Sequence, residues 1–264
     1  MAMIDLTGQV AVVTGGSRGI GREVARQLAE ADATVAVTAR NQEKLAETVS
    51  IITSAGGIAS SYQMDVTDAD EIKTAAEAII ADYGKVDILV NNAGIGDGGA
   101  APWEMDIDRW WHVLEVNLKG VFMVTRAIVP QMVAQDSGCV INMGSLIGAR
   151  PSPDASPYSV SKAALMRFTD SCAVAAEDTG VSFFTISPGL VRTDMTSIPR
   201  FDDIPDEYWS PIETVGVLCV KLASGMADKL SGRFIHAEDD LDDLLARTDE
   251  IIEQNLHVLK YVTE

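Results

Sequence analysis

The sequence predicts an α/β fold: one doubly wound sheet of about seven parallel strands with helices on both faces. Two observations lead to this prediction. Short runs rich in β-branched and other apolar residues alternate with longer helical patterns along almost the whole chain. A glycine-rich turn also joins the first such run directly to a helical segment. Because parallel strands need crossover connections, helical crossovers would cover both faces of this sheet.

The strands are predicted from composition and spacing. Five runs combine Val, Ile and other apolar residues with flanking turn residues, as buried strands do. They lie at residues 10–15, 34–39, 86–92, 139–144 and 181–187, and weaker candidates lie at 59–66 and 232–237.

Helical periodicity fills most of the intervals between these runs. The predicted helices span residues 20–31, 41–55, 69–84, about 106–135 and 157–178. No internal repeat and no Pro/Gly-rich linker interrupts the pattern. We therefore expect a single domain over residues 1–264, ending in an acidic helical tail from about residue 238 to 264.

The composition argues against several classes of protein. A net charge of −19 disfavours nucleic acids and anionic membranes as partners, since both are bound through clustered Lys and Arg. A strand pattern already begins at Val10, which leaves no room for a signal peptide, and no apolar run of about 18 residues occurs. The three cysteines and three histidines have no metal-ligand spacing. We expect a cytoplasmic protein without a metal site.

The glycine-rich turn, TGGSRGIG at residues 14–21, predicts a nucleotide site. Gly15 would permit a tight turn, Gly19 would let the backbone approach a pyrophosphate, and Gly21 would let the helix pack close to the strand. The free N–H groups of the following helix would attract the phosphates. The cofactor-binding residues expected in this turn are Gly15, Ser17, Arg18, Gly19, Ile20 and Gly21.

The end of the second strand indicates which dinucleotide is bound. An acidic residue placed there, about 20 residues after the glycines, would hold the free ribose of NAD. This sequence instead has Arg40, which suits a 2′-phosphate, and Arg18 is a possible second donor. NADP(H) is therefore favoured, although NAD(H) is possible and Arg40 could simply face solvent. Asp65, followed by Val66 at the end of the third strand, is a candidate acceptor for the adenine amino group.

Tyr158 and Lys162 form a candidate proton-transfer pair. Four residues apart on a helix, they share one face. A lysine ammonium beside a phenol favours the phenolate and lowers its pKa from about 10. Ser156 as N-cap and Pro157 as the first helical residue would place Tyr158 at the positive end of the helix as well.

Taken in order, these motifs resemble the short-chain dehydrogenase/reductase family, from about residue 6 to about residue 237. They are TGGSRGIG, NNAG at 91–94, Asn117 in EVNLKG, Ser145 in NMGS, YSVSK and SPG at 187–189. The resemblance implies a Rossmann-like fold and a catalytic tetrad of Asn117, Ser145, Tyr158 and Lys162. It also implies that Asn92, Ala93 and Gly94 line the cofactor floor, and that Pro188, Gly189 and Thr193 contact the nicotinamide carboxamide.

The tetrad implies hydride transfer between NADP(H) and a small carbonyl or alcohol substrate. Tyr158 would move the proton, Ser145 would bind the carbonyl oxygen, and Lys162 would bind the ribose and stabilise the phenolate, with Asn117 supporting Lys162 through a water. The alternatives are a 3-oxoacyl-thioester reductase acting on acyl carrier protein, and a non-catalytic NADP-sensing module. An acidic carrier needs a basic docking patch, whereas the Tyr158 helix ends in AVAAEDTG.

The sequence gives weaker indications of which residues contact the substrate or a second subunit than of the cofactor and catalytic residues. Leu146, Ile147 and Trp103 are candidates for binding the substrate. A homodimer or homotetramer is expected, and Phe122, Leu165 and Phe168 on the two long helices are candidate contacts. The family's VDGG-like turn is replaced here by the acidic tail, which puts the end-to-end subunit contact in doubt.

Overall fold

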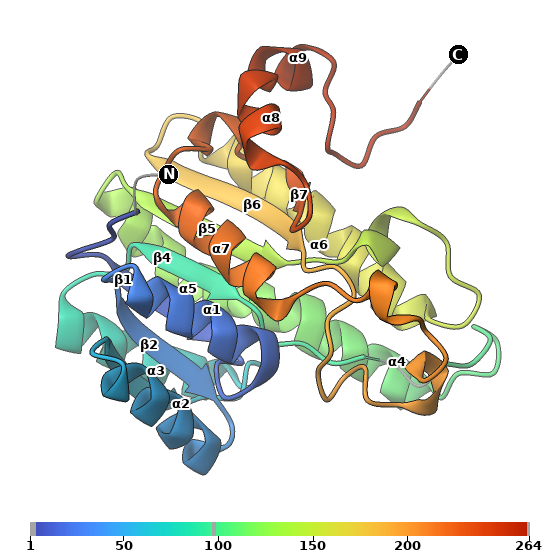
Figure 1. The fold of residues 1–264 in the computed structure, drawn as a ribbon, viewed down its shortest axis with the longest axis horizontal. Helices are drawn as coiled ribbons and strands as arrows, with labels where there is room; N and C mark the ends of the chain where they lie inside the picture. Colours follow the sequence, from blue (N-terminus) through green and yellow to red (C-terminus); the bar gives the residue numbers. More distant parts are fainter. Residues whose placement is uncertain (1–3, 97–98, 263–264) are drawn as a thin grey trace.

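The computed structural model describes residues 4–96 and 99–262. Its centre is a seven-stranded sheet in the order β3-β2-β1-β4-β5-β6-β7, and every neighbouring pair is parallel (Figure 1). The predicted fold class is confirmed. The strands are β1 (Val10–Thr14), β2 (Thr34–Ala39), β3 (Ile58–Gln63), β4 (Ile88–Asn91), β5 (Gly138–Met143), β6 (Val181–Ser187) and β7 (Phe234–His236).

The five predicted helical regions are all helical. The helices are α1 (Gly19–Glu30), α2 (Gln42–Ser54), α3 (Ala69–Tyr83), α4 (Ile107–Leu114), α5 (Val121–Ala134), α6 (Ser156–Ala175), α7 (Ile212–Ala223), α8 (Leu241–Ala246) and α9 (Thr248–Glu253), with a π-helical turn, η1 (Glu115–Gly120), between α4 and α5. α7 was not among the predicted helices. Its residues, IETVGVLCVKLA, include many β-branched ones, which are typical of strands, although the buried residues Val215, Leu218, Cys219 and Leu222 recur at helical spacing.

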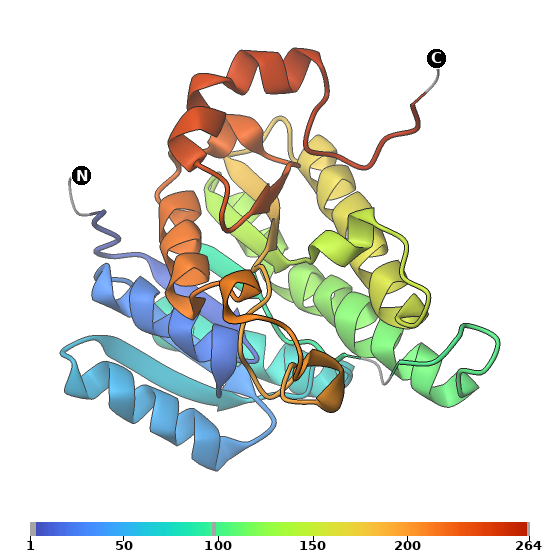
Figure 2. The same ribbon diagram turned by 45° about the vertical axis from the view of Figure 1, so that its right-hand side comes forward.

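The two faces of the sheet carry separate hydrophobic cores. Successive side chains of a strand point to opposite faces, so in β1 Ala11 and Val13 join one core and Val12 joins the other. The first core is covered by α1, α2 and α7, and the second by α3, α5 and the end of α6. Figure 1 and Figure 2 both show α1 beside α7 on one face, with α5 and α6 behind the sheet. The helices therefore cover both faces, as predicted.

The strand order creates a crevice at one edge of the sheet. β1 pairs with β2 on one side and with β4 on the other, so the chain reverses its direction of winding at this point. The loops after β1 and β4 leave the carboxyl edge there and part to opposite faces, which is where open α/β sheets bind ligands. The glycine-rich turn and NNAG are these two loops.

The predicted acidic tail is helical only in its first half. α8 and α9 bury Leu241, Leu244 and Ile251 in the first core. The helix then ends because Asn255 and His257 take left-handed backbone conformations, with φ of 49° and 59°. The chain turns back along β7, where Phe234 N–H donates to His257 O at 2.8 Å, so the tail covers part of the free edge of the sheet. Residues 263 and 264 lie outside the described residues.

One predicted subunit contact is wrong. Leu165 is completely buried within the protomer, because it lies on the face of α6 that packs inward. Phe122 remains 47% exposed, and its ring meets that of Phe168 edge-on with centroids 6.2 Å apart. Within the described part of the chain, no helix has the length and hydropathy needed to cross a membrane.

Candidate active site

The glycine-rich turn brings the N-terminus of α1 to the carboxyl edge of β1. Gly15 and Gly19 have φ of 66° and 53°, a conformation that a side chain would strain. A Cβ added at Gly21 would lie 2.4 Å from Gly15 O, so only glycine lets the helix start this close to the turn. The first turn of α1 carries no acidic residue, and the N-cap residue, Arg18, forms no side-chain cap with the residues described. The amides of α1 are therefore available for an anion.

The loop after β4 is fixed to the end of β1 by side-chain hydrogen bonds. Thr14 Oγ1 accepts from the N–H groups of Asn92 and Ala93, each at 3.0 Å. The Asn92 amide donates in return to Thr14 O at 2.9 Å. The NNAG loop is therefore hydrogen-bonded to the residue that precedes the glycines of the turn. Thr14 was not predicted to have this role, although its place at the end of a strand beside a glycine is a signal for it.

A cavity of about 610 Å³ opens over these two loops, within the size range of ligand pockets. Thirteen predicted cofactor residues line it: Gly15, Ser17, Arg18, Gly19, Ile20, Gly21, Arg40, Asp65, Val66, Asn92, Ala93, Gly94 and Thr193. Further lining residues were not predicted, and among them are Asn41, Lys44, His112, Arg192 and Asp194. Pro188 and Gly189 follow β6 outside this lining.

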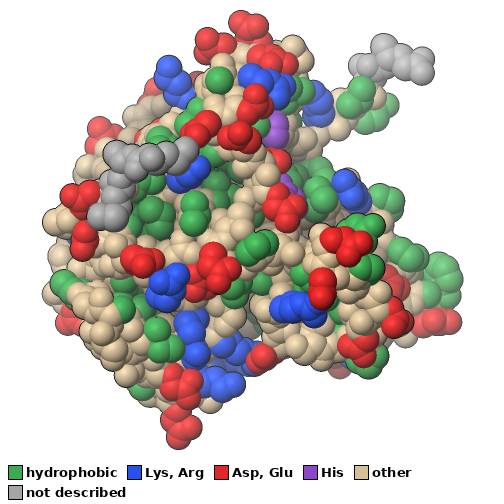
Figure 3. All heavy atoms as spheres, viewed as in Figure 1, with side chains coloured by type: hydrophobic (Ala, Val, Ile, Leu, Met, Phe, Trp, Pro, Cys, Tyr) green, Lys and Arg blue, Asp and Glu red, His purple; other side chains and the backbone are tan. Residues whose placement is uncertain are grey.

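The end of the cavity at α2 is basic. Arg18, Arg40 and Lys44 all line it, and Figure 3 shows Lys and Arg side chains gathered around a hollow in the lower half of the molecule. Arg40 Nη1 lies 3.7 Å from Asp65 Oδ2. Partial burial opposes ionisation of Asp65, but hydrogen bonds from Thr67 and the Arg40 charge hold its pKa below the ordinary value. Cations therefore collect at this point of a protein whose net charge is −19.

Tyr158 and Lys162 share one face of α6, as predicted. Lys162 Nζ lies 5.4 Å from the centroid of the Tyr158 ring and donates to Met143 O at 2.7 Å. The lysine is only 4% exposed, and its burial lowers the pKa to about 8. The ammonium is therefore held at the end of β5, beside the phenol ring.

Asn117 lies in the π-helical turn that separates α4 from α5. Its carboxamide is completely buried, accepts from Ile95 N at 2.8 Å and donates to Ile95 O at 2.9 Å. It also donates to Ser161 Oγ at 3.2 Å. The side chain thus joins the loop after β4 to α6, and π-helical turns of this kind are frequent at functional sites.

Gly94 connects the tetrad residues to the cavity. A Cβ at Gly94 would lie 3.3 Å from Asn117 Oδ1 and 3.8 Å from Lys162 Nζ, and Gly94 itself lines the cavity. Ser145 follows β5 and begins a short 3₁₀ turn. In that turn a Cβ at Gly148 would lie 2.7 Å from the backbone of Lys162, so the turn packs directly on α6. Asn117 and Lys162 therefore meet at Gly94, and the turn that begins after Ser145 packs against the helix that carries Tyr158 and Lys162.

The predicted cap of α6 is wrong. The helix begins at Ser156 and its N-cap is Ala155, without a side-chain cap bond, so Pro157 is the second helical residue. Ser156 Oγ instead accepts from Trp110 Nε1 at 3.2 Å, a contact across to α4. The Ser156 hydroxyl, which the local sequence pattern predicted to cap α6, therefore binds a residue of another helix instead.

Two of the three candidate substrate residues lie beside Ser145, and the third lies away from the cavity. Leu146 and Ile147 follow Ser145 directly and are half-buried, and Leu146 N–H donates to Ser187 Oγ at 3.2 Å. Trp103 is 84% exposed and lines none of the cavities described here. In the part of the chain that the structure describes, no three His, Cys, Asp or Glu side chains converge as in a metal site.

Lys162 gives an expected pH dependence of stability. The lowering of its pKa from 10.5 to about 8 corresponds to about 3 kcal/mol at 1.36 kcal/mol per pKa unit. Below pH 8 the folded protein bears the cost of a buried ammonium, and between about pH 8 and 10.5 only the unfolded chain keeps the proton. We therefore expect the unfolding free energy to rise over this window relative to Lys162→Met.

Urea denaturation of both proteins at several pH values measures this difference. Lys73→Met is the matched control, because Lys73 is 73% exposed and its removal should leave the pH dependence unchanged. A wild-type stability that runs parallel to that of Lys162→Met from about pH 8 to 10.5 would contradict the buried ammonium.

Comparison with known proteins assigns the chain to a family. The profile of the short chain dehydrogenase family matches residues 9–201. A short chain dehydrogenase of Pseudocercospora fijiensis is 36% identical over 263 residues, covering 93% of this chain and 85% of the relative. A 3-oxoacyl-acyl-carrier-protein reductase of Staphylococcus epidermidis is 35% identical over 235 residues, covering 86% of this chain and 96% of the relative.

Solved structures agree with these relatives. A gluconate 5-dehydrogenase from Burkholderia cenocepacia, in complex with NADP and tartrate, is 30% identical with a TM-score of 0.83, covering 89% of this chain and 95% of that one. This chain belongs to the short-chain dehydrogenase/reductase family. It is an oxidoreductase with a Rossmann-like fold, as the resemblance of its motifs implied.

Proposed function

We propose that the chain is an NADP(H)-dependent reductase of carbonyl compounds, or a dehydrogenase of the matching alcohols. One observation carries this proposal: Lys162 Nζ lies 5.4 Å from the centroid of the Tyr158 ring and, with Asn117, comes close to Gly94, which lines the cavity above the glycine-rich turn. A proton-transfer group thus lies at the edge of a dinucleotide-sized site.

The residues of the cavity fit a nicotinamide dinucleotide. The glycine positions leave a space that a Cβ would fill, and the free amides of α1 would bind the phosphates. Arg40 and its neighbours would hold the adenosine end, and Gly94 and Thr193 would lie toward the nicotinamide. When bound, the cofactor supplies or accepts a hydride at the nicotinamide ring.

The chain's own residues would transfer the proton and bind the substrate. Ser145 would donate a hydrogen bond to the substrate carbonyl oxygen, and Tyr158 Oη would give its proton to that oxygen during reduction or take it back during oxidation. The Lys162 ammonium favours the phenolate left behind and would bind the nicotinamide ribose. Asn117 fixes the loop after β4 against α6, which holds these groups in place.

Arg40→Asp should shift the cofactor preference from NADPH toward NADH. The replacement removes a cation from the α2 end of the cavity and adds a carboxylate that can accept from ribose hydroxyls. We expect the ratio of kcat/KM for NADPH to that for NADH to fall by at least about tenfold. Steady-state kinetics with both cofactors measure it, and an unchanged ratio would remove Arg40 from the site.

Reduction of 3-oxoacyl groups on acyl carrier protein remains the second candidate. The Staphylococcus epidermidis relative with that name favours it. The exposed residues after α6, Glu177 and Asp178, would repel an acidic carrier, so free small carbonyl compounds are the favoured substrates. A non-catalytic NADP sensor is the third candidate, and it is less consistent with a sequence in which no member of the tetrad is lost.

The function is tested by following NADPH and NADH oxidation with a panel of ketones, quinones, keto sugars and oxoacyl thioesters, the last both free and on acyl carrier protein. Turnover of small carbonyl compounds with NADPH is the expected result. Turnover confined to the carrier-bound thioester would support the second candidate. Cofactor binding without turnover of any compound would support the sensor.

We further propose that the protein is a homodimer through α4, α5 and α6. Trp111 and Phe122, which are 61% and 47% exposed, line a groove of about 810 Å³ on this side of the molecule. A large exposed apolar patch of this kind is typical of a subunit contact. Sedimentation equilibrium measures the oligomeric state.

A further inference from the structure

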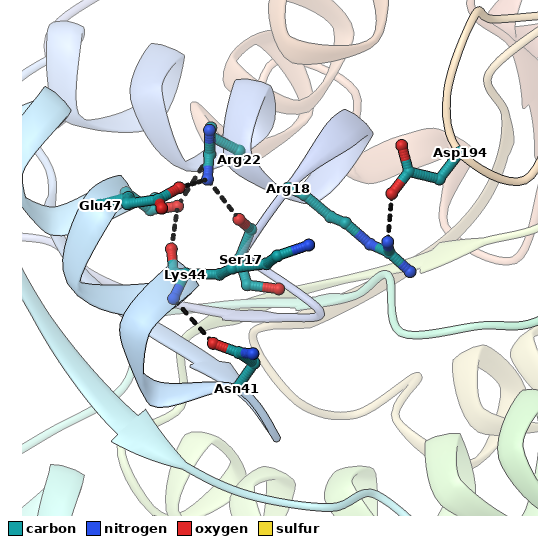
Figure 4. Close-up of polar contacts among 8 residues, drawn as sticks. Ser17, Arg18, Arg22, Asn41, Lys44, Glu47 and Asp194 are labelled. Atoms are coloured by element: carbon teal, nitrogen blue, oxygen red, sulfur yellow. Dashed lines mark hydrogen bonds and ion pairs between the residues drawn. The ribbon is translucent and has the colours of Figure 1, made fainter.

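The β6–α7 loop, residues 188–211, forms one wall of the cavity over the glycine-rich turn. Its residues in the lining are Arg192, Thr193, Asp194 and Met195. Asp194 forms an ion pair with Arg18 of the glycine-rich turn (Figure 4). A Cβ at Gly19 would lie 3.5 Å from Thr193, so the loop packs directly on that turn. The place of this loop therefore shapes the cavity.

The loop is folded around Trp209, near its far end. The guanidinium carbon of Arg192 lies 4.2 Å from the centroid of the Trp209 ring, and Arg192 also forms an ion pair with Asp206. Trp209 Nε1 donates to Ile204 O at 3.2 Å, which fixes the ring against the loop backbone. Because Thr193 directly follows Arg192, the position of Trp209 helps to set the position of the cavity wall.

Ser210, the next residue, is bound on two sides. Its N–H donates to Leu190 O at 2.8 Å and closes the base of the loop. Its side chain is buried, and its hydroxyl donates to the carboxylate of Glu238. A Cβ added at Gly189 would overlap Ser210 Oγ, so the hydroxyl also packs against the turn after β6. A hydrogen bond to a carboxylate is stronger than one between neutral groups, which makes Glu238 the firmer of these contacts.

Glu238 is the first residue of the acidic tail, and a tight turn holds it in place. Its N–H donates to His236 Nδ1 at 3.2 Å, and the His236 N–H donates to Asp239 Oδ2 at 2.8 Å. The tail that follows is anchored through Leu241 and Leu244, which are buried in the first core. Glu238 therefore comes from a rigid part of the fold, the end of β7, and reaches the base of the β6–α7 loop.

We propose that Glu238 is a positioning residue for the cofactor cavity. By holding Ser210, it fixes Trp209, and the contacts of Trp209 with Arg192 carry this order to the cavity wall. Glu238 itself lines none of the cavities described here, so it acts only through the loop. The proposal rests on the proposed function, because it presumes that a dinucleotide binds against this wall. The acidic tail thus has a role: its first turn holds the loop that shapes the cavity.

Limited digestion with trypsin, without cofactor, tests the Ser210–Glu238 bond independently of turnover. The Lys and Arg residues of the β6–α7 loop are Arg192 and Arg200. In Glu238→Ala and in Ser210→Ala, the rate of cleavage after Arg200 should rise by about tenfold or more, because losing a hydrogen bond to a charged group increases the population of the open loop. Mass spectrometry identifies the cleaved peptide bond.

Three further variants make this test specific. Glu253→Ala on α9 is the matched control, because it removes the same charge from an exposed position of the same tail, and it should leave cleavage unchanged. Glu238→Gln keeps a side-chain oxygen that can accept from Ser210, so it should restore most of the protection. The double variant Ser210→Ala/Glu238→Ala should be cleaved no faster than either single variant, since both changes remove one bond.

Fluorescence titration with NADPH measures the effect at the cavity. In Glu238→Ala the dissociation constant should rise by at least about threefold, because the cofactor would then have to order the loop as it binds. The value for Glu253→Ala should equal that of the wild type. An unchanged dissociation constant in Glu238→Ala, beside a normal wild-type affinity, would refute the positioning role.

The digestion separates this proposal from the proposed function. Unchanged cleavage in Glu238→Ala and Ser210→Ala would refute the role of the bond, whatever the wild-type protein binds. Faster cleavage spread over the whole chain would indicate a general loss of stability and would refute it as well. A wild-type protein that binds no NADPH would refute the proposed function, while cleavage confined to the loop in both variants would still support Glu238 as the residue that holds it.

Discussion

Tyr158→Phe is expected to lower turnover by on the order of 10²- to 10⁴-fold, the usual contribution of a general acid or base. The substitution removes only the phenolic oxygen that would carry the proton. The ring remains on α6 beside Lys162. Because the glycine-rich turn and the basic end of the cavity are unchanged, the dissociation constant for NADPH should stay within about twofold of the wild-type value.

The measurement pairs steady-state kinetics with a fluorescence titration of NADPH. Tyr83→Phe is the matched control, since the Tyr83 hydroxyl donates to Ser60 Oγ at 2.7 Å, outside the lining of the cavity. That variant should keep full activity. Near-normal rates in Tyr158→Phe would remove this residue from proton transfer.

Gly21→Ala is expected to weaken NADPH binding by more than about tenfold and to destabilise the fold. The new Cβ would lie 2.4 Å from both Gly15 O and Asn92 Nδ2, and the first of these is backbone. Overpacking of this kind costs about 1–3 kcal/mol, which exceeds the gain of about 1 kcal/mol in helix propensity. The turn must therefore move away from α1, and the amides that would face the pyrophosphate move with it.

Gly56→Ala separates the local effect from general destabilisation. Gly56 has a φ of 93°, so alanine there is strained, at a cost of roughly 1–2 kcal/mol. No atom lies within 4 Å of its added Cβ, and Gly56 does not line the cavity. Urea denaturation should report a loss of stability in both variants, and the NADPH titration should change only in Gly21→Ala. Equal NADPH affinities in the two variants would contradict the role of the close approach at Gly21.

Most strands and helices could be predicted because a buried segment leaves a continuous or periodic apolar pattern in the sequence. β6 has its predicted bounds because the run VSFFTIS is buried along its whole length. α7 also carries a pattern of this kind, because its buried residues Val215, Leu218, Cys219 and Leu222 recur at helical spacing, but it was not predicted. Its many β-branched residues favour a strand by propensity, which opposes the periodicity.

Part of the candidate site could be predicted from the sequence for a different reason. Glycines, Arg40 and the spacing of Tyr158 and Lys162 are local features with a direct chemical meaning. Lys44 and Asp194 looked like ordinary surface charges, and Thr14 looked like the last residue of a strand. Their importance depends on what lies opposite them, across loops that are far apart in sequence.

The sequence by itself determined the parallel sheet, the glycine-rich turn and the residue types of the tetrad, because each follows from local periodicity or from steric limits on a few neighbouring residues. Tertiary structure decided which cations pair with carboxylates, which partner the Ser156 hydroxyl takes and where the tail turns back along β7. These outcomes arise from pairings between distant segments, such as Arg18 with Asp194 and Ser156 with Trp110. Their free energy depends on distance and burial, which only the folded chain specifies.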